Sequence, residues 1–290
     1  MRHAVLGRRD REAPPRGWVP LAPSLLVLAL LFFLPLALMV AISFLSAYPG
    51  PGRPTLEHYA RLVGDHYFLR ITLQTLRLAL VVTGACLVAG YPVAYYLART
   101  GSRHKHLVFI AIISPLLVSV VVRTLGWIML LGSEGVVNGL LTRLGLVSRP
   151  LDLMYSFTTI VVGLVHVFLP FMVLSITSVL SGIDRALEES AEVLGAGRWR
   201  AFLWVTLPLS LRGVVTGCVL VFSMTLGAYV TPFVLGGGKL HFLATLIYDR
   251  MLVTVEWPLG ATMAVLLLAV TVALLTASAV AGRRVAADPR

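Results

Sequence analysis

One polar segment, residues 181–212, interrupts an otherwise apolar chain and holds the residue types best suited to specific contacts. It places Glu189, Ala191 and Gly195 within a single short stretch. A small side chain permits close approach to another surface, a glycine permits a sharp turn, and a carboxylate can fix position through charge-assisted hydrogen bonds. By themselves, these residue types suit contact with a partner protein or with the membrane surface.

The same segment carries the signals of two short helices. Asp184 can cap the first, and Glu188 falls in its early turns, where negative charge complements the helix dipole. Gly195 stands where a C-terminal cap is expected. We expect a second helix over residues 198–206, stopped by Pro208, whose ring disfavours helix at the preceding residue. By charge pattern alone, an amphipathic helix resting on lipid headgroups is an equally good interpretation.

The rest of the chain predicts an all-α membrane protein. Apolar types make up 58% of the residues, charged types 13%, and the mean hydropathy is +0.90. A soluble domain carries about 25% charged residues, and a membrane helix needs about 20 apolar residues. We expect one transmembrane domain over residues 20–282, between tails at 1–19 and 283–290, with six spans at 20–45, 71–98, 107–131, 153–180, 213–235 and 257–281.

Basic residues predict the orientation. The net charge of +11 does not indicate nucleic-acid binding, because these residues sit at helix ends rather than along one face. Fifteen of the 24 Lys and Arg residues lie in the two tails, in the connection between the second and third spans, and in the segment 181–212. The positive-inside rule therefore places both termini and the polar segment in the cytoplasm.

The spacing of the polar segment matches a known motif. It reads Glu189-Ser190-Ala191, three residues, Gly195, nine residues, Val205, one residue, Leu207-Pro208. This resembles the EAA loop of ABC importer permeases, with Ser190 in place of Ala and Val205 in place of Ile. The resemblance implies that the loop docks into a groove on a separate ATP-binding subunit. The coupling residues would then be Glu189, Ala191, Gly195, Ala196 and Pro208.

Further motifs resemble the spermidine/putrescine-type permease subunits: Val122-Arg123-Thr124 with Trp127, Leu169-Pro170-Phe171, Tyr229-Val230-Thr231-Pro232 and Trp257-Pro258-Leu259-Gly260. The resemblance implies the type I ABC importer permease fold in a bacterial inner membrane. It also implies three partners, namely a second similar permease, an ATPase subunit that binds the ATP, and an extracytoplasmic solute-binding protein. Opines, phosphonates and ferric iron are the alternatives to a polyamine as the solute.

A few residues are candidates for a substrate pathway. Arg123 is the costliest residue in the chain, because a charge at the bilayer centre costs about 2.5–3.5 kcal/mol. It is either a translocation gate or, as we prefer, an arginine tied to a helix end near the outer interface. Trp127 and Tyr229 are further candidates, and the pair Glu256 and Trp257 could attract an organic cation. Packing, or contact with the binding protein, is the alternative for each.

Other function classes find little support in the residues. Residues Gly236-Gly237-Gly238 lack the Lys-Ser/Thr of a phosphate-binding loop. No catalytic constellation or set of metal-ligating residues is recognisable, so we expect no enzyme activity, cofactor or metal. A secondary transporter is the alternative class, but it would need ionisable residues within the membrane, and no Asp or Glu falls in the middle of a predicted span.

Overall fold

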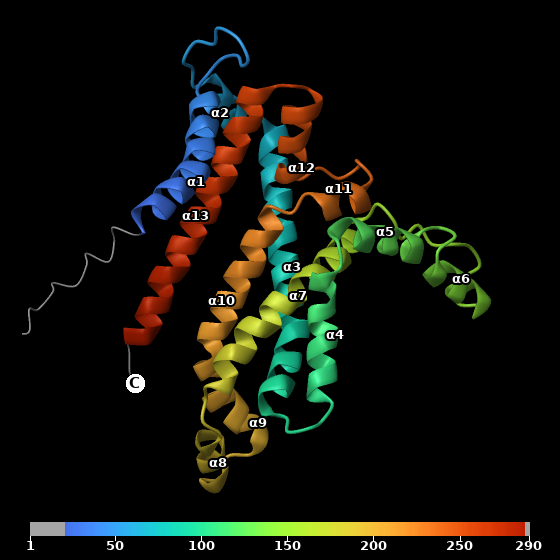
Figure 1. Cartoon of the computed structure of the whole chain (residues 1–290). Helices are drawn as coiled ribbons and strands as arrows, with labels where there is room; N and C mark the ends of the chain where they lie inside the picture. Colours follow the sequence, from blue (N-terminus) through green and yellow to red (C-terminus); the bar gives the residue numbers. More distant parts are fainter. Residues whose placement is uncertain (1–20, 288–290) are drawn as a thin grey trace, which may run out of the picture.

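A computed structural model describes residues 21–287, so the predicted tail at 1–19 and the last three residues lie outside the described part (Figure 1). The regular structure of the described residues is helical, with one isolated bridge between Leu45 and Pro54. The elements, of which η1 and η2 are π-helical turns, are α1 (Ala22–Ser43), α2 (Glu57–Gly64), α3 (His66–Arg99), α4 (Lys105–Leu117), α5 (Val120–Leu131), α6 (Val136–Arg143), α7 (Phe157–Ser181), α8 (Arg185–Val193), α9 (Arg198–Ala201), η1 (Phe202–Thr206), α10 (Leu207–Leu226), α11 (Val230–Gly236), α12 (Leu243–Tyr248), η2 (Asp249–Val253) and α13 (Trp257–Ala287).

Six helical stretches in this part of the chain are long and apolar enough to cross a membrane. They cover residues 23–43, 66–99, 120–143, 157–181, 198–226 and 257–278. The predicted all-α membrane class with six spans is therefore confirmed.

Two of the predicted spans have the wrong bounds. The expected third span, 107–131, is divided between α4 and α5, because the backbone is extended at Val118 and Ser119. Figure 1 shows α4 upright and α5 turned across its upper end. The expected fifth span, 213–235, runs past the end of α10 into the separate helix α11. The residues at both breaks are mostly apolar, so hydropathy alone does not reveal them.

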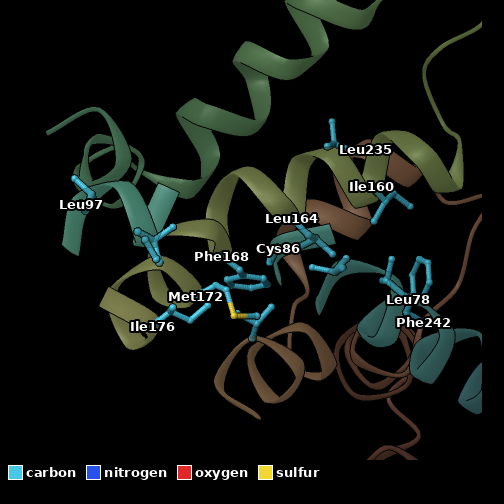
Figure 2. Close-up of a cluster of buried hydrophobic side chains, with 14 of the residues drawn as sticks. Leu78, Cys86, Leu97, Ile160, Leu164, Phe168, Met172, Ile176, Leu235 and Phe242 are labelled. Atoms are coloured by element: carbon cyan, nitrogen blue, oxygen red, sulfur yellow. The ribbon is translucent and has the colours of Figure 1, made fainter. Parts of the chain in front are cut away.

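Helices α3, α7 and α10 form the packed core. Side chains from α3 and α7 meet in a buried cluster (Figure 2) that includes Leu78, Cys86, Leu164, Phe168, Met172 and Ile176. Helix α10 approaches α7 closely at Gly217, where an added Cβ atom would lie 2.7 Å from Sδ of Met172. Small residues allow backbones to approach in this way, and van der Waals packing then holds membrane helices together.

Different short helices lie at the two ends of the bundle. Helices α8 and α9 lie at the foot of the bundle, and α2, α11 and α12 lie toward its other end (Figure 1). Helix α1 packs chiefly on α13 and leaves large apolar side chains exposed along its length, among them Leu28, Leu31, Phe33 and Leu34. Such a surface is suited to lipid or to another membrane helix.

Candidate functional site

Helix α8 has a defined beginning and end. Oδ1 of Asp184 accepts a hydrogen bond of 3.0 Å from the backbone N–H of Ala186, as expected for a cap. At the other end, the N–H of Gly195 donates to O of Glu192 and the N–H of Ala196 donates to O of Ala191, both at 3.0 Å. These two bonds form a Schellman motif. Gly195 has φ of +91°, a value that other residues adopt only with strain.

The foot of the bundle exposes apolar side chains. Val193 and Leu194 are 87% and 88% exposed, and Trp199 and Trp204 are also largely exposed. We call these four residues the tip. Large apolar side chains gathered at one end of a molecule mark an interaction surface. Of the predicted coupling residues, Glu189 and Pro208 are exposed, and Ala191, Gly195 and Ala196 lie around the turn that ends α8.

The expected end of the second helix at Pro208 is wrong. Residues 198–226 form one continuous helical stretch of α9, η1 and α10. Pro208 sits in the first turn of α10, directly after η1, where the N–H of Leu207 donates to O of Phe202, five residues back. The wider π turn re-routes the backbone hydrogen bonds at the point where proline has no N–H to donate. Trp199 and Trp204 of the tip therefore lie in the same helical stretch as a membrane span, and the turn at 194–197 joins Val193 and Leu194 to it.

Arg123 is tied to a helix end. Its side chain is on α5, only 9% of the residue is exposed, and Nη1 donates a hydrogen bond to O of Pro115 in the last turn of α4. Carbonyls of the last turn lack partners within their own helix, so the guanidinium satisfies one of them. This bond agrees with the tie to a helix end that we prefer, whereas a position near the outer interface and a role as a gate both stay predictions. Trp127, one turn further along α5, packs edge-on against His166, with ring centroids 5.6 Å apart.

The remaining pathway candidates fall into two other groups. Tyr229 stacks on Tyr248, with ring centroids 4.5 Å apart, and on Phe233 at 5.3 Å. Glu256 forms an ion pair of 2.8 Å with Arg250, and Trp257 lies edge-on to Tyr48. Within residues 21–278, no hydrogen bond, ion pair or aromatic contact joins these groups to each other or to Trp127. Helix α11, which begins directly after Tyr229, nevertheless packs on α5, which carries Arg123 and Trp127. The role of these residues in a pathway stays a prediction.

Comparison with known proteins identifies the family. The family model described as "Binding-protein-dependent transport system inner membrane component" matches residues 87–286. The spermidine/putrescine transport system permease protein PotB of Salmonella typhimurium (strain SL1344) is 32% identical over 243 residues, which cover 83% of this chain and 84% of PotB. PotB of Escherichia coli (strain K12) is also 32% identical over 243 residues, covering 83% and 88%. The chain belongs to this family.

A solved structure extends the likeness to the fold. The permease is similar to a chain of the bacterial alginate ABC transporter, crystallised in complex with an alginate pentasaccharide-bound periplasmic protein. The TM-score is 0.72 and the identity 19%, covering 93% of the permease and 96% of the solved chain. The predicted ABC importer permease fold is thus confirmed. Permeases of this kind are multi-pass inner-membrane proteins that act in transport with an ATPase, a second permease and a periplasmic binding protein, and they are not enzymes.

The sequence did not reveal the role of Glu188, which the structure places in contact with the ends of α3 and η1. Glu188 was assigned only to the dipole of α8, but its Oε1 accepts hydrogen bonds from Arg99 at the end of α3 and from Thr206 in η1. The distances to Arg99 Nη2 and Thr206 Oγ1 are 2.6 Å and 2.7 Å. The only sequence feature that could have drawn attention to Glu188 is its position directly before the motif residue Glu189. Its partners Arg99 and Thr206 lie 89 and 18 residues away, and no sequence motif marks them.

Proposed function

We propose that this permease forms half of a solute pore and couples to a separate ATPase through α8 and the tip. Glu189, Ala191, Gly195, Ala196 and Pro208 are the coupling residues, and the ATP is bound by the partner. The observation that carries this proposal is the exposed apolar tip, of which Val193 and Leu194 lie at the end of the capped helix α8 and Trp199 and Trp204 lie in the helical stretch 198–226. A docked partner can displace such an element, and the displacement reaches a span directly.

The arrangement of the loops supports a cytoplasmic position for this end. The α3–α4 connection, which holds Arg103 and is followed by Lys105 at the start of α4, lies at the same end of the bundle as α8 and α9 (Figure 1). The α3–α4 connection and the segment 181–212 are both rich in basic residues, which is typical of cytoplasmic loops. We therefore place both termini in the cytoplasm and the α2 and α12 end outside, facing an extracytoplasmic binding protein. A second, similar permease completes the pore, and lipid surrounds the pair.

For the solute we propose a polyamine such as spermidine or putrescine. The relatives named PotB support this class, and the stacked rings of Tyr229, Tyr248 and Phe233 offer π faces suited to an organic cation. Arg123, Trp127, Glu256 and Trp257 are further pathway candidates. The alginate structure shows that one fold serves chemically different solutes, so opines, phosphonates and ferric iron stay as alternatives. Family membership leaves a secondary transporter without support.

The coupling proposal is tested by a charge placed on the tip. Leu194→Glu puts a carboxylate in an apolar docking contact, where its desolvation is costly, so we expect loss of a co-purifying ATPase subunit. Leu56→Glu is the matched control, since Leu56 is also well exposed but precedes α2 at the opposite end. The measurement is the molar ratio of ATPase to permease after affinity purification. A full ratio with Leu194→Glu, or no ATPase with the unaltered permease, would contradict the proposal.

The solute is tested through the binding protein that delivers it. Thermal-shift screening of the cognate binding protein against spermidine, putrescine, an opine, a phosphonate and ferric iron separates the alternatives. We expect stabilisation by spermidine or putrescine, because binding to the folded state alone raises the unfolding temperature. Stabilisation by one of the other three alone would replace the polyamine assignment and leave the coupling proposal intact.

A further inference from the structure

Three helical elements meet at one carboxylate oxygen at the foot of the bundle. Oε1 of Glu188, on α8, accepts hydrogen bonds from Nη2 and Nε of Arg99, the last residue of α3, at 2.6 Å and 3.1 Å. The same oxygen accepts a third, of 2.7 Å, from Oγ1 of Thr206, the last residue of η1. One side chain thus links α8 to α3 and to the helix that continues as α10.

Further bonds fix the same ends of α3 and α8. Nη1 of Arg99 donates to O of Ile183 at 2.9 Å, next to the residue that caps α8. In the reverse direction, Nη2 of Arg185 donates to the backbone O of Arg99. Each helix end therefore binds the backbone of the other through a guanidinium, which fixes their relative position as well as their distance.

The link is sheltered, unlike the other ion pair of this segment. The side chains of Arg99 and Glu188 are 12% and 18% exposed, and Thr206 is fully buried. Arg198 and Glu192 approach only to 3.8 Å, with side chains 94% and 47% exposed. Water screens an exposed pair of this kind, so it transmits little force. The sheltered pair is the one that reaches a membrane span.

Aromatic packing and a second polar contact join α3 to η1 and α10 above the carboxylate. Tyr91 and Tyr95 of α3 pack edge-on against Phe202 of η1, with ring centroids 5.7 Å and 5.6 Å apart. The hydroxyls of Tyr91 and Ser210 are 2.8 Å apart, within hydrogen-bond distance. The ring contacts hold η1 against α3, and the hydroxyl contact holds the start of α10 against it.

The adjacent residues Glu188 and Glu189 of α8 have different surroundings. Successive residues of a helix point about 100° apart, so Glu188 faces the spans while Glu189 is exposed to a partner. We propose that Glu188, Arg99 and Thr206 are positioning residues that transmit a displacement of α8 to α3 and, through η1, to α10. This inference rests on the proposed function, because it assumes that an ATPase displaces α8.

The test uses the intact complex, with ATPase, second permease and binding protein, reconstituted in liposomes. The probe is spermidine, or the solute identified by the thermal-shift screen if spermidine fails. For Glu188→Ala we expect normal co-purification of the ATPase but a fall of about tenfold in solute taken up per ATP hydrolysed, within the usual range of coupling effects. A purely structural role would lower uptake and hydrolysis together and leave this ratio unchanged.

Two further variants sharpen the test. Thr206→Val removes one of the three hydrogen bonds at similar volume, so we expect a smaller fall of about threefold in the same ratio. Glu192→Ala is the matched control, because it removes the exposed pair with Arg198, and we expect no change.

Three results would overturn the inference: an unchanged ratio in both Glu188→Ala and Thr206→Val, an equal fall in Glu192→Ala, or loss of the ATPase from the Glu188→Ala complex. The last would assign Glu188 to docking or folding. Absence of ATP-dependent uptake by the unaltered complex would instead refute the proposed function itself, so the two failures are distinguishable.

Discussion

The core of α3, α7 and α10 and the segment 182–197, which carries α8 at the foot of the bundle, are held by different forces. In the core, Cys86, Met172 and Val221 are fully buried among apolar neighbours. In the segment, α8 buries no residue completely, and caps and the contacts of Glu188 define its position. Packing holds the core over its whole length, whereas a few directional bonds hold the segment. The segment can therefore shift as a unit while the core stays folded.

This contrast predicts where the effect of a substitution is felt. Overpacking a membrane-helix contact disturbs many van der Waals contacts at once, so the whole domain loses stability. Loss of one cap or one backbone turn costs less and acts on the segment alone. The following variants test this separation, beginning with the core.

Gly217→Leu tests the core and should have the largest effect. A Cβ atom at Gly217 would lie 2.7 Å from Sδ of the fully buried Met172, so this side chain must shift, and the rest of a leucine side chain must find room between α10 and α7. Overpacking of a buried site costs about 1–3 kcal/mol. We expect a lower thermal unfolding temperature and a lower yield of monodisperse protein in detergent.

The control for this variant is Gly84→Leu. Gly84 is an exposed glycine of α3, and an added Cβ atom there meets no atom within 4 Å. Both substitutions add the same apolar volume to a membrane span, so only the contact with α7 differs. An unfolding temperature that is equal for the two variants would show that the α7–α10 approach does not set the stability of the core.

The same contrast explains which parts of the structure could be predicted from the sequence. The first helix of the segment was predictable because its signals are local: Asp184 caps the start of α8 and Gly195 ends it, as expected. The six spans were predictable because a bilayer demands long apolar runs. The breaks at 118–119 and after Leu226 were not predictable, since apolar residues on both sides give the same hydropathy whether the helix continues or turns.

The partners of Glu188 were beyond the sequence for a different reason. Arg99 lies 89 residues away, and only the packing of α3 against α7 and α10 brings it to the foot. The helix continues through Pro208 because the π turn η1 precedes it, and a π turn has no sequence signal as clear as that of a helix cap. Pathway residues such as Tyr229 are harder still, since part of their surroundings belongs to a second subunit under the proposed function.

Gly195→Ala should have an intermediate effect, confined to the segment. A side chain at φ of +91° costs about 1–2 kcal/mol, although the structure leaves space for the Cβ atom itself. We expect faster hydrogen exchange in α8, by about five- to thirtyfold since 1.4 kcal/mol corresponds to a factor of ten, and an unchanged unfolding temperature of the whole domain. Gly195→Asn is the control, because asparagine tolerates this conformation better and should exchange more slowly than the alanine variant. A fall in the unfolding temperature as large as that of Gly217→Leu would mean that segment and core are one cooperative unit.

Asp184→Ala should have the smallest effect of the three. It removes one capping bond, to the N–H of Ala186, and a lost cap costs about 1 kcal/mol. The neighbouring backbone stays fixed, because Arg99 still donates to O of Ile183, so only the first turn of α8 should open more often. Exchange at the amides of 186–188 should rise by about fivefold, with Asp184→Asn, which keeps an acceptor oxygen, close to the unaltered protein. Exchange that also rises in α3 or α10 would show that the cap supports the spans, and the separation between a packed core and a bond-held segment would then fail.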